Sequence, residues 1–515
     1  MATAAPRPEE KADLTAWLAV AAGTLGALMA TLDISIVNSS LPTIQGEIGA
    51  SGSEGAWVAT AYLVAEIIII PLSAWLERLL GLRTFLLIAV SLFTVFSVLC
   101  GFSNTLGMMI AGRVGQGITG GALIPTAQTI IAQRLPRSQQ SIGTAMFGVV
   151  AICGPIVGPL VGGWLTENAS WHYAFFLNVP ISVILLTLLL VGLDYEPPRF
   201  DLIHEADWFG VAGMALGMGG LTVVLEEGAR DEWFSSVFIQ RTAIVSVIGF
   251  ILLLWGQLTA PRPVIKLSLL ADRQFGSVAL MGMALGVVLY GTSYAIPQFL
   301  SAIPDYNALQ SGKIVMISGI PSIMMMPFVP ILMKHVDIRI AVGGGMALMA
   351  LSSYLETDLT IQSVGGEFVV SQLIRGIGQI LGMLFLSQAC VQSVPPEDAG
   401  DASGLFNAMR NLGGSFALAG IAIVQQDRMW FHSRRLEETM NANAPNVQAY
   451  VASLSQGIGG ADGAIQRIGQ QIQAQAVTMT YNDIFFLMSA VTAAVVPLVI
   501  FLRPLPNSGK MAAVH

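Results

Sequence analysis

Apolar residues in this chain gather in long runs that are separated by short polar segments. A run of about 20 apolar residues can cross the hydrocarbon core of a bilayer as a helix. Fourteen runs are of this kind, so the pattern predicts an all-α polytopic membrane protein with fourteen spans. The predicted spans cover residues 16–37, 56–76, 82–102, 107–132, 141–165, 172–193, 207–227, 238–260, 275–302, 312–333, 339–357, 366–394, 401–425 and 482–502.

The composition leads to the same class of protein. Hydrophobic residues make up 54% of the chain and charged residues only 11%, against about 25% charged residues in an ordinary soluble domain. The mean hydropathy of +0.70 agrees. The net charge of −8 comes largely from connecting segments and does not indicate a nucleic-acid partner. All three cysteines fall in apolar runs, so no disulfide framework is expected.

The basic residues predict the orientation. An even number of spans puts both termini on one side of the membrane, and the first run is too long to be the apolar part of a cleaved signal peptide. With the termini in the cytoplasm, the inner segments hold 14 lysines and arginines, whereas the short outer loops hold only Arg230, Arg241 and Lys313. This asymmetry follows the positive-inside rule, from which the long segment 427–481 is excluded. Both termini are therefore expected in the cytoplasm.

A weak internal repeat divides the chain. A shift of 259 positions superposes spans 107–132 and 141–165 on spans 366–394 and 401–425. Parallel repeats of this kind bracket a substrate site near the midplane of transporters. The repeat predicts a six-helix bundle in residues 1–193, two inserted helices in 194–273, a second six-helix bundle in 274–502 and a cytoplasmic tail in 503–515. The aligned identities include Gly117 with Gly376, Gln133 with Gln392, Phe147 with Phe406, and Gly154 with Gly413.

Span 141–165 carries glycines and prolines at a spacing of four residues. Residues four apart lie one above the other on a helix, so this face has almost no side chains. Another helix can approach such a face closely, and the prolines bend the helix that carries them. Two interpretations remain open: a tight contact between helices, or a seam where the two halves pack and which governs the transport motion. The residues are Gly154, Pro155, Gly158, Pro159, Gly162 and Gly163.

Ionisable residues inside a bilayer are costly and are therefore candidates for function. Asp33 and Arg113 lie at matching depth in the outer halves of their spans. If they pair, each offsets the desolvation of the other, and protonation of Asp33 would release Arg113. Such a pair suits a proton-operated gate, although a static structural ion pair remains the alternative.

Glu66 falls near the centre of span 56–76, among isoleucines. It is a candidate proton carrier or a partner for cationic substrates, and the alternative is a protonated acid that bonds to a neighbouring helix. Glu226 and Glu227, at the outer end of span 207–227, are expected to be a solvated, interfacial pair. A wider set of polar residues is predicted to line a substrate cavity, although structural roles for Arg375 and Arg410 are favoured. This set comprises Glu66, Gln116, Tyr290, Arg375, Asn407 and Arg410.

Motifs for other chemistries are missing from the sequence. No Gly-x-x-x-x-Gly-Lys-Ser/Thr loop is present, so ATP is not expected to be the energy source. The five histidines lack metal-ligand spacing, and no nucleophile–base set is apparent. The sequence therefore predicts a secondary transporter, without an enzyme activity, a metal or a cofactor, that is driven by the proton gradient.

Four stretches carry a family resemblance: residues 32–38, 113–117, 154–163 and 171–180. With them the chain resembles the major facilitator superfamily, and in particular the 14-helix drug:proton antiporters of the EmrB/QacA type. The resemblance implies proton-coupled export of amphipathic toxic compounds, a role for Arg113 in proton coupling, and an antiporter motif in residues 154–163. A dedicated exporter or importer of one metabolite on the same fold is the alternative, and a membrane scaffold that transports nothing is a further one.

The long segment 427–481 is predicted to lie outside the membrane, with residues 425–438 continuing the helix that precedes it and a weak helix over 466–476. It is either a solvated hairpin or a docking surface. The resemblance favours the EmrB side of the family, which implies a bacterial inner-membrane protein with a periplasmic EmrA-like adaptor and a TolC-like outer-membrane channel. The family's charged loop after the second span is degraded at residues 76–83, so its inner-gate role is not assigned to Glu77.

Overall fold

The computed structural model describes residues 12–260, 263–440, 445–455 and 461–503, and this part of the chain is helical without strands. We call α1–α9 the N-terminal half and α13–α21 the C-terminal half. The N-terminal half contains α1 (Leu14–Ile48), α2 (Gly52–Gly55), α3 (Trp57–Leu80), α4 (Leu82–Gly101), α5 (Leu106–Gly120), α6 (Leu123–Arg134), α7 (Arg137–Asn168), α8 (His172–Phe176) and α9 (Asn178–Gly192).

Two longer helices lie between the halves in sequence, α11 (Trp208–Glu227) and α12 (Val237–Thr259), after the short α10 (Asp201–His204). The C-terminal half contains α13 (Arg273–Ala302), α14 (Ala308–Met316), α15 (Gly319–Met325), α16 (Val329–His335), α17 (Ile338–Tyr354), α18 (Phe368–Gln392), α19 (Ala399–Thr439), α20 (Pro445–Ser455) and α21 (Ala461–Val495). Within the described residues, six short 3₁₀ turns connect these helices or extend their ends; the last one is η6 (Val496–Phe501).

Every predicted span lies in helical structure. Within the described residues, ten helical segments are long and apolar enough to cross a membrane. The remaining four predicted spans correspond to α5 with α6, α7, α17 and α19. Of these, α5, α6 and α17 are too short to cross a membrane alone, although α17 is apolar, whereas α7 and α19 carry many glycines and polar residues.

Corresponding helices pack in the same way in the two halves. Helix α1 packs along α7, and α13 packs along α19, which are the pairs that the 259-residue shift relates. The inserted helices α11 and α12 pack against each other, and α11 also lies on both α3 and α19. The insertion therefore touches both halves.

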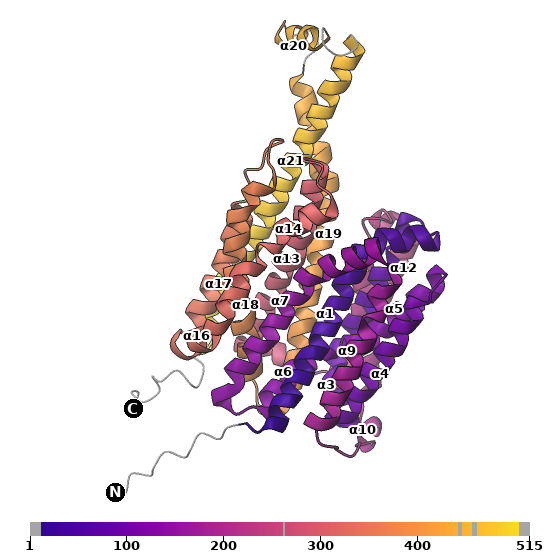
Figure 1. The fold of residues 1–515 in the computed structure, drawn as a ribbon, viewed down its shortest axis with the longest axis vertical. Helices are drawn as coiled ribbons and strands as arrows, with labels where there is room; N and C mark the ends of the chain where they lie inside the picture. The colour runs from indigo at the N-terminus through magenta and orange to yellow at the C-terminus, as the bar shows by residue number, and fades with distance from the viewer. Residues whose placement is uncertain (1–11, 261–262, 441–444, 456–460, 504–515) are drawn as a thin grey trace.

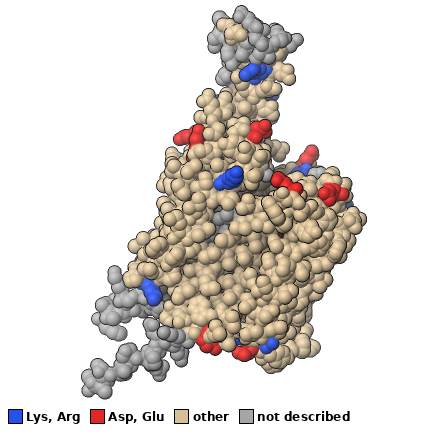
Figure 2. Space-filling model, viewed as in Figure 1, with Lys and Arg blue, Asp and Glu red and all other residues tan. Residues whose placement is uncertain are grey.

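On one face of the molecule, the charged residues leave an uncharged belt between two charged ends. Figure 2 shows that lysine, arginine, aspartate and glutamate gather toward the ends of the bundle and on the projecting hairpin, with a broad uncharged belt between them. Near the first and last described residues, Ala12 donates to Gln139, and Arg339 donates to the carbonyl of Leu502. Both bonds join a chain end to a loop that the sequence predicts on the cytoplasmic side. The predicted tail 503–515 lies outside the described residues, apart from Arg503.

A helical hairpin projects from the opposite end. Helices α19 and α21 run side by side beyond the bundle, and α20 lies near their tip (Figure 1). The predicted continuation through 425–438 and the predicted helix over 466–476 are both confirmed, as parts of α19 and α21. Since a helix rises about 1.5 Å per residue, the 14 residues of α19 from 426 to 439 extend it by roughly 20 Å beyond the predicted span.

Candidate functional site

Asp33 and Arg113 form a buried ion pair in the N-terminal half. An Nη atom of Arg113, on α5, lies 2.6 Å from a carboxylate oxygen of Asp33, on α1, and both side chains are at most 1% exposed. The Nε of Arg113 also donates to the carbonyl of Val58, at 3.0 Å. Helix α5 reaches α3 this closely because Gly117 faces the Tyr62 carbonyl, where a Cβ would not fit. The predicted pairing is therefore present.

Uncharged polar residues complete the shell around Asp33. Gln116 and Asn178 donate to one oxygen of Asp33, at 2.9 and 2.7 Å. The Ser97 hydroxyl accepts from both amides, while Gln116 accepts from Arg113 at 3.0 Å. Gln116 was predicted to line the substrate cavity, but the structure buries it completely in this network. Ser97 and Asn178 were missed as candidates, because a neutral polar side chain in a membrane helix is not conspicuous in a sequence.

Tyr62 connects this pair to Glu66. The Arg113 guanidinium lies over the Tyr62 ring, 4.2 Å from its centroid. The Tyr62 hydroxyl is buried and lacks a hydrogen-bond partner within the described part of the chain. Tyr62 and Glu66 are four residues apart on α3, so they lie one above the other on the same face. A movement of the Arg113 side chain can therefore affect Glu66 through the Tyr62 ring.

Glu66 belongs to a second cluster, between the halves. Its side chain is 2% exposed, and one carboxyl oxygen has no hydrogen-bond partner among the described residues. The carboxyl group lies beside Asn411 on α19 and within electrostatic range of Arg410 on the same helix. Asn411 in turn accepts from the Tyr290 hydroxyl at 3.3 Å and from Arg410 at 3.5 Å. The structure thus brings together three predicted cavity residues and adds Asn411. We call Glu66, Tyr290, Arg410 and Asn411 the central cluster.

Arg375 is bound elsewhere. Its Nη2 lies 2.6 Å from Glu356, and its Nε donates to Ser352 at 3.3 Å. Glu356 also accepts from Ser371 at 2.6 Å and from Gln372 at 3.3 Å. All of these side chains are buried. Arg375 thus has its own carboxylate inside the C-terminal half, which agrees with the structural role that the sequence favoured.

The two buried networks are related by the repeat. The 259-residue shift superposes Ser97 on Glu356, Arg113 on Gln372 and Gln116 on Arg375. The arginine and the glutamine have exchanged places, and the acid has moved from α1 to the end of α17. Glu356 was missed by the sequence reasoning, because it lies at the edge of a predicted span, where an acid is ordinary.

A polar contact closes the predicted cytoplasmic end. Gln128 on α6 bonds to Ser387 at 3.3 Å, to Ser403 at 2.6 Å and to Asn407 at 3.2 Å. Gln128 and Ser387 are 259 residues apart, so they are mates in the repeat. Residues that contact their own mates lie at the pseudo-twofold axis between the halves. Asn407, which was predicted to line the cavity, belongs to this closure.

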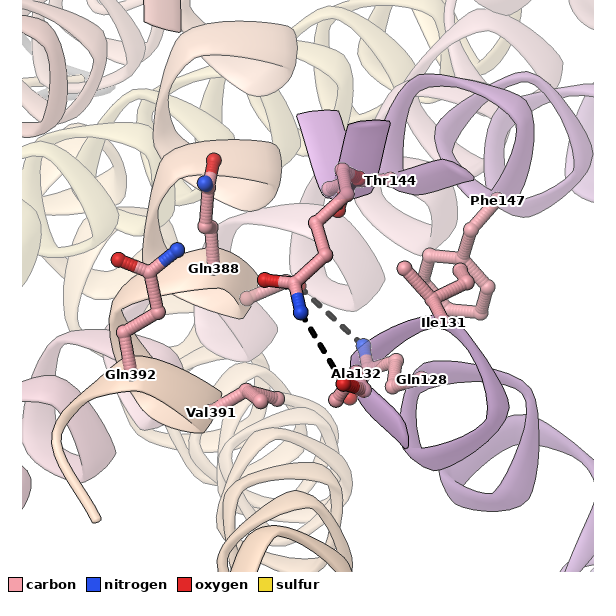
Figure 3. A pocket seen from close by; sticks show the side chains of 10 residues that line it. Gln128, Ile131, Ala132, Thr144, Phe147, Gln388, Val391 and Gln392 are labelled. Atoms are coloured by element: carbon pink, nitrogen blue, oxygen red, sulfur yellow. Dashed lines mark hydrogen bonds between the residues drawn. The ribbon is translucent and has the colours of Figure 1, made fainter. Parts of the chain in front are cut away.

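Figure 3 shows a small pocket beside this contact, lined by Gln388 and Gln392 of α18 on one side and by Gln128 of α6 on the other. The carboxamide oxygens of Gln388 and Gln392 are buried and have no hydrogen-bond partner within the described ranges. Farther out, Arg78 bonds to Asp401 at 2.8 and 3.2 Å. The contacts hold the halves together at this end.

The glycine face of α7 packs on α1. A Cβ added at Gly154, Gly158 or Gly162 would overlap Thr31, Ser35 or Ser39, which follow one another at the same four-residue spacing. These three glycines therefore lie inside the N-terminal half, and the interpretation that the two halves pack along them is wrong. Other positions of α7 do contact the C-terminal half, at α14, α15, α16 and α18. A different position on α7, Gly148, faces Leu384 of the C-terminal half.

The remaining motif residues lie off this face. No heavy atom outside the local helix lies within 4 Å of a Cβ added at Gly163, and Pro159 is exposed. The side chain of Pro155 lies outside the described part of the structure. The two sets of four-spaced residues thus do not share one packing surface.

Glu226 and Glu227 differ from the expected solvated pair. Glu227 is 2% exposed and lies 2.5 Å from both the Thr60 hydroxyl and an Nη atom of Arg230. Glu226 is half-buried and accepts from the Ser415 hydroxyl at 2.7 Å. The prediction was wrong because the sequence does not reveal that α3 and α19 cover this end of α11. Within the ranges that the structure describes, no group of three His, Cys, Asp or Glu residues is arranged to hold a metal.

A bundle of membrane-spanning helices with buried ion pairs and a polar cluster between two related halves defines a membrane transporter. The sequence model of the Major Facilitator Superfamily matches residues 23–418. The chain belongs to this superfamily, whose members are secondary transporters and not enzymes. Such transporters are driven by ion gradients and usually need no cofactor.

Two relatives and one solved structure illustrate the similarity. The "Colistin resistance protein EmrB" of Acinetobacter baumannii is 34% identical over 92% of this chain and 91% of its own. The "Multidrug export protein EmrB" of Escherichia coli K12 is 32% identical, over 93% of this chain and 94% of its own. The crystal structure of the human organic anion transporter MFSD10 superposes with a TM-score of 0.59 at 15% identity, covering 93% of this chain and 99% of that one. This last similarity supports the fold alone.

Proposed function

We propose that this protein is a proton-coupled multidrug exporter that exchanges protons for amphipathic toxic compounds. The observation that carries the proposal is the buried Asp33–Arg113 pair, which Tyr62 connects to the Glu66 carboxyl between the halves. The relatives named as a multidrug exporter and a colistin resistance protein support the choice of drugs as substrates.

Protonation of Asp33 is the step that changes the network. Neutral Asp33 no longer balances the Arg113 charge, and an uncompensated buried charge costs about 3–5 kcal/mol. Since each 1.4 kcal/mol is a factor of about ten, this cost shifts a two-state equilibrium a hundredfold or more. The described state is closed at the predicted cytoplasmic end, so a proton from outside that binds Asp33 favours the return to the inward-facing state. Glu66, in the central cluster between the halves, is the second acid that the release of Arg113 affects, through Tyr62.

The exchange can be measured in everted membrane vesicles that are acidic inside. Adding a drug should release protons from the lumen, because each exported molecule enters the vesicle as protons leave. We expect several chemically unrelated amphipathic drugs to give this response. A response to one compound class only would favour the alternative, a dedicated carrier of a single metabolite. No proton release with any drug would contradict the proposal.

We also propose that the chain lies in the bacterial inner membrane with both termini in the cytoplasm. The distribution of lysine and arginine supports this orientation. The contacts of Ala12 with Gln139 and of Leu502 with Arg339 put both ends of the described chain beside loops of the same predicted side. The hairpin of α19 and α21 then extends into the periplasm.

The hairpin is the part that we propose to dock an EmrA-like adaptor, which would lead to a TolC-like outer-membrane channel. It exposes large apolar side chains, with Trp430 61% exposed and Ile465 60% exposed. A pocket of about 780 Å³, lined by Met429, Trp430 and Ile472 among others, lies between its helices and Ala229, just after α11. Apolar groups held outside a membrane belt favour a protein partner.

Deleting residues 436–475 should abolish capture of a purified EmrA-like adaptor while leaving insertion into the membrane intact. The deletion removes the tip and keeps the parts of α19 and α21 that pack in the bundle. Pull-down from detergent measures capture, and drug-stimulated proton release in adaptor-free vesicles serves as the control for folding. Unaltered capture would count against docking at residues 436–475, since Met429 and Trp430 remain in this variant.

A further inference from the structure

The inserted helix α11 ends in two carboxylates that bind opposite halves of the molecule. Glu227 bonds to Thr60 of the N-terminal half and is neutralised by Arg230. Glu226, the next residue back, bonds to Ser415 of the C-terminal half. Successive residues on a helix point about 100° apart, which allows this division. Glu227 anchors α11 to α3, and Glu226 faces α19.

Glu226 lies directly beside the central cluster. Ser415 follows Asn411 by four residues on α19, so the Glu226 carboxyl sits one helical turn from the Asn411 amide. Tyr290, on α13, lies within electrostatic range of Glu226 as well as of Glu66 and Arg410. The charged groups that act on Glu226 itself are Glu227 and Arg230, both on its own segment.

Carboxyl groups outnumber the remaining guanidinium groups around Tyr290. Arg113 and Arg230 are bound to Asp33 and Glu227. Around Tyr290 this leaves two carboxyl groups, of Glu66 and Glu226, with the guanidinium of Arg410. One oxygen of Glu66 is buried and lacks a hydrogen-bond partner among the described residues.

Aromatic surface is available at the same place. The Tyr290 and Tyr294 side chains are 37% and 40% exposed, so solvent or a ligand can reach their rings. An aromatic face beside an excess of carboxylate attracts an organic cation by both ring and charge. A polar or anionic ligand would instead meet Glu66 and Glu226 as repulsive or desolvated groups.

We propose that Glu226 is a cation-selecting residue of the substrate site, supplied by the inserted helices. A lipophilic organic cation pairs with the Glu226 carboxylate, displaces the Ser415 hydroxyl, and lies against Tyr290. The inference rests on the proposed export function and adds a substrate class and a residue to it. It also gives the insertion a role, because α11 then carries a specificity group into the space between the halves.

The test compares a cation with an uncharged compound on the full-length protein. Tetraphenylphosphonium and chloramphenicol are the probes, with transport into everted vesicles and binding to purified protein as two separate readouts. Glu226→Gln should weaken tetraphenylphosphonium binding at least about tenfold, and should lower the cation-to-neutral transport ratio by a similar factor. Ser415→Ala removes the competing hydroxyl and keeps the carboxylate, so it should not lower that ratio.

Each other outcome overturns the inference. If Glu226→Gln leaves tetraphenylphosphonium binding unchanged, or lowers transport of both probes equally, Glu226 does not select cations. Equal losses in Glu226→Gln and Ser415→Ala would mean that their hydrogen bond, not the charge, matters. If the unaltered protein transports neither probe, the export function fails, whereas the binding measurement still decides whether Glu226 holds a cation.

Discussion

Replacing Asp33 by asparagine should lower drug export at least about a hundredfold while the protein still inserts in the membrane. Asparagine keeps an oxygen that can accept from Gln116 and Asn178, so the local packing changes little. It cannot bind or release a proton, and it leaves Arg113 without a counter-charge, at a cost of about 3–5 kcal/mol. Drug resistance and drug-stimulated proton release, compared at equal protein levels, measure the effect.

The double variant separates coupling from stability. Arg113→Ala alone should also abolish export, because it leaves the Asp33 charge buried with neutral donors only. Asp33→Asn with Arg113→Ala removes both charges, so thermal stability in detergent should recover much of what each single variant loses. Transport should not recover. If the double variant regains export and proton exchange, the pair is a static structural one.

The second buried pair supplies a matched control. Glu356→Gln breaks the contact with Arg375, which is as short and nearly as buried as the contact between Asp33 and Arg113. We expect a similar loss of thermal stability with drug-stimulated proton release retained. A loss of proton release as large as that in Asp33→Asn would mean that breaking any buried ion pair stops the protein.

The sequence predicts those features that depend on one helix alone: the membrane spans and the charged residues inside them. Length and hydropathy predict the spans, because a segment in lipid must satisfy its backbone hydrogen bonds internally, as a helix does, and must be apolar over about 20 residues. The same reasoning finds Asp33, Arg113 and Glu66, because a charge in an apolar run is conspicuous. It misses Ser97 and Asn178, whose neutral side chains carry no such cost. It also misses Glu356, which sits at the edge of a span where an acid is ordinary.

Contacts between helices are harder to predict from the sequence. The four-residue glycine spacing does indicate close packing, but it does not name the partner helix, and the partner is α1 rather than the opposite half. Glu226 and Glu227 are a similar case. Their position at a span end suggests solvent, whereas the packing of α11 on α3 and α19 removes them from it.

Gly158→Leu should lower export at least about tenfold without preventing insertion. Even a Cβ at this position would overlap Ser35, so leucine must push α1 away from α7. Overpacking of a tight contact costs about 1–3 kcal/mol for small additions, and leucine adds a whole side chain. Asp33 is two residues from Ser35 on α1, so the displacement also pulls the carboxylate out of reach of Arg113. Resistance and proton release at matched protein levels measure the loss.

Gly163→Ala is the matched control on the same helix. An added Cβ there has open space on every side, so export should stay within about twofold of the unaltered protein. Gly158→Ala should fall between the two, since its methyl group meets Ser35 but is small. This order of export losses follows from the position of each glycine relative to α1. The sequence motif alone would not distinguish the two glycines. Normal antiport in Gly158→Leu would mean that the glycine face has only an ordinary packing role. An equal loss of export in Gly163→Ala would mean that the contact with α1 is not the reason why the motif matters for transport.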